Sequence, residues 1–191
     1  MCDWSSDVCS SDLCYDEGKR CAETFTVEYG TKVPGRTAVD VRIARIFNTY
    51  GPRMAGDGRV VPTFIRQALR GEDITMFGDG SQTRSFCFID DMVEGLSRLM
   101  EHPGFHGPIN LGNPEEVTIA DLATSIISHT RSQSRIVRRD LPPDDPKRRK
   151  PDISAAQRLL GFEPKVTLAD GIAATVADVM ARESGAFVLA S

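Results

Sequence analysis

The sequence predicts an α/β fold in which amphipathic helices alternate with mostly parallel strands. Runs rich in Val and Ile are separated by segments whose apolar residues recur every three or four positions. Thr118 and Thr167 each precede an amphipathic run and are followed three residues later by Asp121 or Asp170, as in a capping box. Strands that alternate with helices in this way favour parallel pairing.

The composition is that of a globular domain. With 40% hydrophobic and 26% charged residues, the 191-residue chain can bury a core without disulfides. The net charge of -4 argues against duplex nucleic acid or an anionic membrane as a partner. No apolar run approaches the ~20 residues of a membrane-spanning helix, and the start does not look like a signal peptide, so we expect a cytoplasmic protein. The five cysteines include no C-x-x-C pair and the histidines show no ligand spacing, so neither a disulfide framework nor a metal site is expected.

Local patterns define the first elements. Residues 1–13 show no helical or strand periodicity and are predicted to be a disordered leader. A helix is predicted from near Tyr15 to Gly30, because apolar residues recur there at helical spacing: Cys21, Ala22, Phe25 and Tyr29. After a loop over 31–37, the Val- and Ile-rich segment 38–47 is predicted to be a buried, parallel strand.

Later segments continue the alternation. A helix is predicted over 60–69, ended by Gly71, and its inner face comprises Val61, Phe64, Ile65 and Ala68. Short extended segments are predicted over 74–77 and 84–89, around a turn at 78–81. Asp90 or Asp91 is expected to cap a helix that runs to about Met100, with an inner face of Met92, Val93, Leu96 and Leu99. A short strand is predicted over 108–111.

Tyr15 and Lys19 are the first candidates for catalysis. They lie four residues apart at a predicted helix start, so their side chains share one face. A nearby ammonium favours the phenolate, so Tyr15 can act as a general base on a substrate hydroxyl. An isolated Tyr-x-x-x-Lys is more often an ordinary surface pair, and only its context decides between the two interpretations.

Two further places carry polar groups suited to a ligand. Asn48 and Thr49 follow the predicted strand 38–47, where parallel sheets bind ligands, but they can also simply close a turn. The glycine-containing turn 78–82 can form a plain hairpin, or Arg84 beside its backbone amides can hold a phosphate. The residues alone leave these alternatives open.

A basic run occupies residues 144–152. Such runs are usually solvated and less often contact nucleic acid. The flanking aspartates and prolines of this one indicate a rigid loop rather than a disordered basic tail. An arginine on such a loop is a good bidentate partner for a diphosphate or a carboxylate.

Several motifs, taken in order, carry a resemblance to a known family. They are YDEGKRCAET, RIARIFNTYGPRM, DGRVV, GDGSQTRSF, NLGNPEE, and DDPKRRKPDIS followed by LLGFEPKV. This combination closely resembles the extended short-chain dehydrogenases that decarboxylate UDP-glucuronate to UDP-xylose, and the resemblance runs from Cys14 to about Glu183. Tyr-x-x-x-Lys marks the whole superfamily, whereas SQTR and DDPKRRKPDI point to the decarboxylating branch.

The resemblance implies a bound NAD cofactor, a UDP-sugar substrate and a set of site residues. Tyr15 would take the proton of the sugar 4-hydroxyl while hydride passes from C4 to NAD, and Lys19 would bind the nicotinamide ribose and lower the Tyr15 pKa. The 4-keto acid would then lose carbon dioxide, and hydride would return to C4. Arg149 would face the charged end of the substrate and complete the catalytic set. Thr49 and Arg59 match positions near the cofactor. The positions that match UDP-sugar ligands are Tyr29, Asn48, Gly78, Asp79, Gly80, Ser81, Gln82, Arg84 and Arg149.

The resemblance also implies a division of the chain. No Gly-x-x-Gly-x-x-Gly turn occurs, so the N-terminal dinucleotide-binding half is expected to be absent and the isolated chain inactive. What remains would be the C-terminal part of a Rossmann-like fold with a small substrate-binding α/β lobe. The expected parts are a leader foreign to the family (1–13), the end of the Rossmann-like part (14–58), mainly the substrate lobe with interleaved Rossmann segments (59–185), and a tail (186–191).

Two alternative functions fit the same motifs. One is a nucleotide-sugar 4-epimerase or 4,6-dehydratase of the same family, which shares Tyr15 and Lys19. The other is a non-catalytic remnant that still binds nucleotide sugars. The family is usually dimeric through the Tyr-bearing helix, so residues 14–29 are the expected contact surface of a homodimer.

Overall fold

The computed structural model describes residues 14–31, 35, 37, 39–56, 58–104, 107–140 and 148–188. For residues 14–16, 148–149 and 185–188 it describes the backbone alone. The predicted leader, residues 1–13, lies outside the described residues.

Helices and strands alternate along most of the described chain. The helices are α1 (Cys14–Gly30), α2 (Val60–Leu69), α3 (Ile89–Glu101), α4 (Ile119–Thr130), α5 (Ser154–Leu160) and α6 (Leu168–Val188). The strands are β1 (Ile43–Ile46), β2 (Thr49–Tyr50), β3 (Ile74–Phe77), β4 (Thr83–Ser85), β5 (Cys87–Phe88), β6 (Pro108–Leu111), β7 (Glu116–Thr118), β8 (Ile136–Arg139) and β9 (Arg148–Arg149). The predicted α/β fold class is confirmed.

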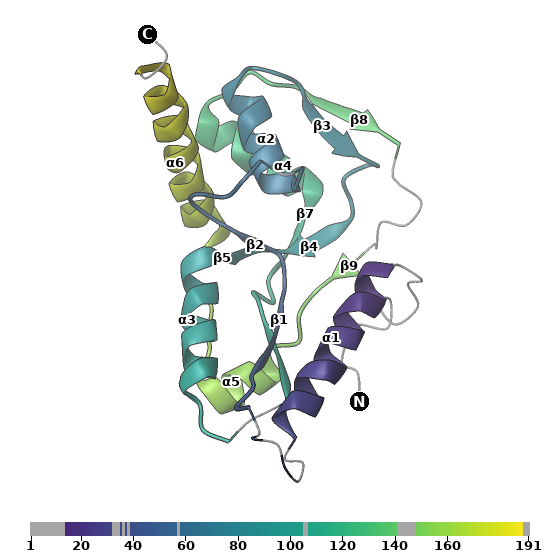
Figure 1. The fold of residues 1–191 in the computed structure, drawn as a ribbon. Coiled ribbons are helices and arrows are strands. Elements are labelled where there is room, and N and C mark those ends of the chain that lie inside the picture. Colours follow the sequence, from purple (N-terminus) through teal and green to yellow (C-terminus); the bar gives the residue numbers. More distant parts are fainter. Residues whose placement is uncertain are drawn as a thin grey trace.

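The elements form two lobes, each with its own hydrophobic core (Figure 1). The upper lobe in Figure 1 contains α2, α4 and α6 with β3 and β8, and the lower lobe contains α1, α3 and α5 with β1 and β6. Fully buried residues of the upper core include Ile65, Leu122, Ile126 and Ile172. Those of the lower core include Leu99, Ile109, Leu111 and Phe162. The short strands β2, β4, β5, β7 and β9 lie where the lobes meet.

Most strand pairs are parallel, as the sequence predicts. β1 pairs with β6, β2 with β5 and β3 with β8, all in parallel. The predicted strand 38–47 is thus parallel, although its ladder covers only Ile43–Ile46. The prediction that it is buried is wrong for most of the ladder, because only Ile43 of these four residues is buried. β4 is the centre of a three-stranded sheet, antiparallel to β7 and parallel to β9. Because β3 and β4 belong to different sheets, the turn between them is not the hairpin that the sequence left open.

Local sequence rules succeed at two helix starts and fail at a third. Thr118 and Thr167 accept hydrogen bonds from the amides of Asp121 and Asp170, at 3.0 Å and 3.2 Å, so both capping predictions are confirmed. The predicted cap at Asp90 or Asp91 is wrong. α3 already begins at Ile89, directly after the pairing of β5 with β2 ends at Phe88.

The predicted inner face is fully confirmed for α2 but only partly for α3. In α2, all four predicted positions are buried, and the backbone leaves the helix through Gly71 at φ 67°. In α3, Met92 and Leu99 are buried, but Val93 is 52% exposed. The Asp91 carboxylate, rather than capping α3, accepts the amide of Val166 at 3.0 Å and so ties α3 to the segment before α6.

α1 forms as predicted but turns its apolar residues outward. Phe25 is 60% exposed and Tyr29 is 56% exposed. The inner side of the helix carries Glu23, whose two carboxylate oxygens each accept a hydrogen bond from the Arg45 guanidinium at 2.7 Å. The Arg45 side chain is only 9% exposed, so a charge pair joins the helix to β1.

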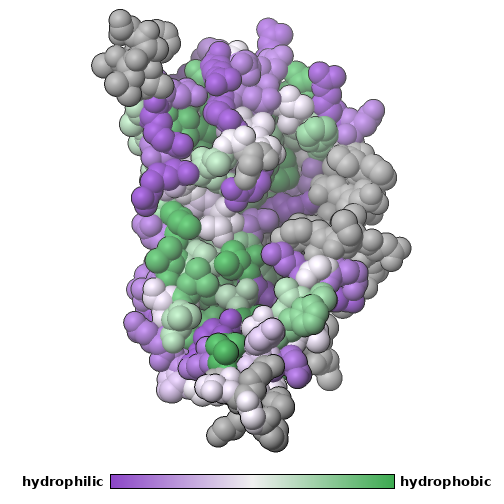
Figure 2. Space-filling model, in the orientation of Figure 1, coloured by the Kyte–Doolittle hydropathy of each residue, from purple (hydrophilic) through white to green (hydrophobic). Residues whose placement is uncertain are grey.

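The surface beside α1 is also apolar. Figure 2 shows hydrophobic side chains gathered over the region of β1, between α1 and α3. Ile46, the last residue of β1, is 55% exposed. A sheet edge and helix face of this kind are surfaces on which further protein can pack.

The Glu23–Arg45 pair predicts an asymmetric response to charge removal in α1. Glu23→Gln removes the negative charge of the carboxylate that binds the buried Arg45 guanidinium, and we expect it to lower the free energy of unfolding by about 1.5–3 kcal/mol. Glu17→Gln is the matched control, because Glu17 pairs with Arg20 at the surface of the same helix. Urea unfolding followed by circular dichroism measures both variants. Equal effects would show that the pair to Arg45 contributes nothing special.

Gly112 predicts a second difference between matched variants. A Cβ at this position would lie 2.9 Å from the Cβ of Phe47 and 3.0 Å from Cγ of Pro151. Gly112→Ala must therefore displace one of them, and we expect a loss of about 1–3 kcal/mol in the free energy of unfolding. Gly18→Ala in α1 meets nothing within 4 Å and should gain up to about 1 kcal/mol. If Gly112→Ala left the free energy of unfolding unchanged in the same urea titration, the result would contradict the tight packing around Gly112.

Candidate functional site

Two arginines predicted to bind substrate come from strands that lie side by side. In the pairing of β4 with β9, Arg84 is the register partner of Arg149. Paired strands are about 4.8 Å apart, so the backbones of these residues are neighbours although they are far apart in the sequence. The Arg84 side chain is mostly buried, and its Nη1 donates a hydrogen bond to the Thr83 carbonyl at 2.8 Å.

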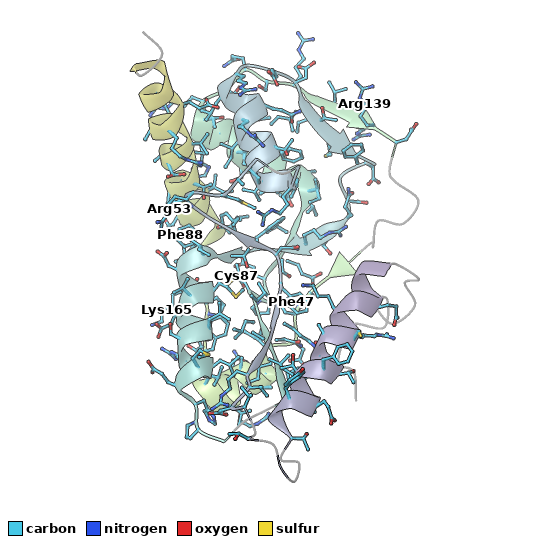
Figure 3. The ribbon with its side chains drawn as sticks, viewed as in Figure 1. Phe47, Arg53, Cys87, Phe88, Arg139 and Lys165 are labelled. Carbon is cyan, nitrogen blue, oxygen red and sulfur yellow. The ribbon has the colours of Figure 1, made fainter. Side chains whose placement is uncertain are left out.

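Asn48 joins the end of β1 to this sheet. Its side-chain Nδ2 donates a hydrogen bond to the backbone carbonyl of Ser85 at 3.2 Å. Its backbone carbonyl accepts a hydrogen bond from the backbone amide of Cys87 at 2.8 Å. Figure 3 labels Phe47 and Cys87, which lie in the middle of the molecule where the lobes meet. Thr49 donates its hydroxyl hydrogen to the Phe47 carbonyl at 2.9 Å. Both predicted polar residues therefore lie at the carboxyl end of a parallel strand, where they also fix the backbone.

The turn from Gly78 to Gln82 is held by its own side chains. Ser81 donates both its amide and its hydroxyl hydrogen to the Asp79 carboxylate, at 2.9 Å and 2.6 Å, and these bonds lower the pKa of Asp79. Gln82 donates its side-chain amide to the Phe77 carbonyl at 2.7 Å. The turn therefore has a defined shape before any ligand binds.

The same turn is packed against the start of α4. The carbonyls of Gly80 and Gln82 accept the amides of Ala120 and Ile119, each at 3.1 Å. Gly80 has φ 82°, and a Cβ there would lie 2.5 Å from the Met76 sulfur, so only glycine fits. β4 follows directly after this turn and contains Arg84, so the geometry of the turn helps to set the position of Arg84.

α1 carries Tyr15 and Lys19 near its N-terminal end. In Figure 1 this end of the helix points toward β9, and the C-terminal end points away. Lys19 is exposed. Tyr29 follows Tyr15 by 14 residues on the same helix, which amounts to about 21 Å along the axis. The structure therefore does not bring Tyr29 to Tyr15.

Arg59 lies at the start of α2. It is exposed and is the N-cap residue of α2, with an extended backbone and no side-chain capping bond. Its carbonyl accepts the Thr63 amide at 3.1 Å. The chain thus presents the Arg59 side chain at the end of the loop that follows β2.

Residues not singled out from the sequence hold the segment that contains Arg149. Asn110 donates its side-chain amide to the Asp152 carbonyl at 3.0 Å, and Gly112 allows Pro151 to pack beside Phe47. Glu116 contacts both Thr83 and Lys150. These residues stand within the motifs NLGNPEE and DDPKRRKPDIS, so the sequence signal existed, but only their spatial contacts reveal this role.

Other features of the described residues do not form a separate reactive site. No group of His, Cys, Asp or Glu suited to a metal ion occurs within the part of the chain that the structure describes. Burial, reinforced by the charge of Asp91, raises the pKa of Cys87 to about 12, so this thiol stays protonated. Among the described helices, none is both long and apolar enough to cross a membrane.

Comparisons with known proteins place these features in a family. UDP-glucuronic acid decarboxylase 4 from Arabidopsis thaliana is 54% identical over 174 residues, which cover 90% of this chain and 38% of the relative. UDP-glucuronic acid decarboxylase 1 from Danio rerio is 52% identical over 164 residues, which cover 85% of this chain and 38% of the relative. The chain thus spans less than half the length of these relatives.

Solved structures agree with the sequence comparisons. The UDP-glucuronic acid 4-epimerase from Bacillus cereus, in complex with UDP-glucuronic acid and NAD, matches with a TM-score of 0.79 and 30% identity. The match covers 88% of this chain and 52% of the epimerase chain. The model of the NAD dependent epimerase/dehydratase family matches residues 6–112. Because this match covers more than half of the chain, the protein belongs to the NAD dependent epimerase/dehydratase family.

Proposed function

We propose that this chain carries the substrate-binding part of an NAD-dependent enzyme that decarboxylates UDP-glucuronate to UDP-xylose. The observation that carries the proposal is the register pairing of Arg84 with Arg149, which places two arginines of the decarboxylase-like motifs on neighbouring strands. The close similarity to UDP-glucuronic acid decarboxylases from a plant and a fish supports it.

The proposed substrate site collects groups that suit a nucleotide diphosphate sugar. Arginine binds diphosphate and carboxylate groups through paired hydrogen bonds, and a buried guanidinium such as that of Arg84 keeps a fixed orientation. Asn48 and the turn from Gly78 to Gln82 flank the same strand and offer amide and hydroxyl groups to the substrate. Arg149 is proposed to face the carboxylate end of the sugar.

Tyr15 and Lys19 are proposed to perform the proton transfer. One turn of α1 separates them, so a lysine ammonium beside the phenol stabilises the phenolate that accepts the proton of the sugar 4-hydroxyl. The exposed Lys19 suits a contact with the ribose hydroxyls of NAD, and Thr49 and Arg59 are proposed to lie near the same cofactor. Bound there, NAD would supply the acceptor, and later the donor, of the hydride at C4 of the sugar.

Loss of carbon dioxide follows from the oxidation at C4. A ketone at C4 is β to the sugar carboxylate, so the electron pair left by carbon dioxide moves into the carbonyl as an enolate. Protonation of this enolate at C5 and return of hydride to C4 give the xylose sugar. Arg149 is proposed to orient the carboxylate while the carbon–carbon bond breaks, and Tyr15 returns its proton to the 4-oxygen in the last step.

A 4-epimerase is the second candidate function. The similarity to the UDP-glucuronic acid 4-epimerase from Bacillus cereus favours it, because that enzyme acts on a substrate with the same carboxylate. An epimerase also oxidises C4 but keeps the carboxylate and returns hydride to the other face of the sugar. The two candidates therefore differ in whether carbon dioxide is released.

We also propose that the protein works as a homodimer in the cytoplasm. The outward-facing Phe25 and Tyr29 of α1 support a contact on this helix, because large apolar residues on a helix surface are typical of interfaces. We propose that Tyr29 contributes to this contact surface, and its part in substrate binding stays a prediction from the resemblance.

The proposed reaction is tested by joining this chain to the N-terminal part of the Arabidopsis relative that precedes the matched region. With NAD and UDP-glucuronate labelled at the carboxylate, we expect release of labelled carbon dioxide and formation of UDP-xylose. Tyr15→Phe should lower the turnover number by about 10²–10⁴-fold. Formation of the 4-epimer without carbon dioxide would instead establish the epimerase, and no turnover in a chimera that binds both ligands would refute both.

Arg149→Lys separates the two candidate functions further. Lysine keeps the positive charge but loses the planar pair of donors that orients a carboxylate. For decarboxylation we expect a loss in kcat of at least about tenfold, since one well-placed charged hydrogen bond contributes about 1.5–3 kcal/mol. Arg148→Lys, in the same strand, is the matched control. An unchanged kcat for Arg149→Lys would remove this residue from the proposed catalytic set.

A further inference from the structure

Glu116 connects all three strands of the sheet that contains Arg84 and Arg149. It is the first residue of β7, and its Oε1 accepts a hydrogen bond from the Thr83 hydroxyl of β4 at 2.9 Å. Its Oε2 lies 3.6 Å from Nζ of Lys150, the residue that follows β9. One carboxylate thus reaches the centre strand through one oxygen and the end of the far strand through the other.

The placement of this contact matters because β9 is short. The ladder between β4 and β9 covers only Thr83 with Arg148 and Arg84 with Arg149. Two paired residues give little register specificity by themselves, so side-chain contacts must keep such a strand in place. The Glu116–Lys150 contact lies directly after the second pair, at the residue next to Arg149.

The environment favours a lasting contact over a fluctuating surface pair. The Glu116 side chain is 19% exposed and that of Lys150 is 43% exposed. The Thr83 hydroxyl fixes one oxygen of Glu116, so less side-chain freedom is lost when Lys150 binds the other. Beyond Lys150 the chain is held again, by Pro151 against Gly112 and by the Asp152 carbonyl bound to Asn110.

We propose that Glu116 is a positioning residue for nucleotide-sugar binding, which holds the Lys150 end of β9 so that Arg149 stays beside Arg84. The proposal rests on the proposed function in so far as Arg149 binds the UDP-sugar. Successive residues of a strand face opposite sides, so Thr83 and Arg84 point to opposite faces of the sheet. Glu116 binds Thr83 on that face, so we expect it to act on the ligand through the position of β9.

The first test measures β9 itself in the full 191-residue chain by amide hydrogen exchange. Glu116→Ala removes the contacts to Thr83 and Lys150, and we expect exchange in the peptide that contains Arg148 to Lys150 to become about tenfold faster. Lys150→Met removes the charge pair alone and should give about a threefold increase. Glu115→Ala, which changes the exposed neighbouring residue, is the matched control and should leave exchange unchanged. Equal exchange in Glu116→Ala and Glu115→Ala would overturn the proposal.

The second test measures UDP binding to the same variants by calorimetry. We expect the dissociation constant of UDP to rise about tenfold in Glu116→Ala and about threefold in Lys150→Met. The reversed pair Glu116→Lys with Lys150→Glu restores the contact and should bring affinity back toward that of the unchanged chain. A merely structural role would lower the melting temperature without moving the affinity of the folded protein, and that result would overturn the proposal.

The outcomes also separate this inference from the proposed reaction. If the chimera releases no carbon dioxide but the chain binds UDP and Glu116→Ala weakens that binding, the decarboxylase proposal fails and the positioning role stands. If the chimera is active and Glu116→Ala leaves both exchange and UDP affinity unchanged, the positioning role fails alone. A chain that binds no UDP even at millimolar concentration overturns the positioning role, whatever the chimera does.

Discussion

The pairing of β4 on both of its edges is the constraint on which the candidate site depends. β4 is only three residues long, yet it joins β7, which leads into α4, and β9, which carries Arg149. The turn before it is fixed to the start of α4, and Asn48 binds the backbone after Arg84. The backbone at the centre of these contacts has little freedom, so the fold fixes the position of Arg84 in the sheet.

The two lobes meet at this strand, which explains why Asn48, Arg84 and Arg149 lie close together here although they come from distant segments. The upper lobe contributes the turn and α4, and the lower lobe contributes the end of β1 and the segment after β9. Ligand sites commonly form where parallel strands end and where two packed units join. The chemistry that we propose would therefore use the place that this architecture makes available.

Sequence reasoning succeeds where the deciding interactions are local. The caps at Thr118 and Thr167 and the buried face of α2 follow from residues within one or two turns. β7, β8 and β9 were not predicted, because strands of two to four residues acquire their structure from partners far along the chain. The motifs identified the arginines, but the contacts that hold Arg149 beside Arg84 required the pairing of β4 with β9.

α1 shows what helical periodicity leaves undecided. Its apolar residues recur at helical spacing, yet the structure places Glu23 against Arg45 and exposes Phe25. Helical periodicity identifies two faces of a helix, but it does not say which of them faces the rest of the chain. A bidentate charge pair of low exposure can take the inner side, and the apolar side is then available to another surface.

The short strands of the central sheet have a further consequence for the order of folding. α2, α4 and their caps involve contacts between residues close in sequence, which form early at small cost in chain entropy. β4 can meet β9 only after a loop of more than 60 residues has closed, and loop closure becomes more costly with length. The strand pair that carries Arg84 and Arg149 is therefore expected to form later than these local elements, so a newly made chain gains its candidate binding site only after they have formed.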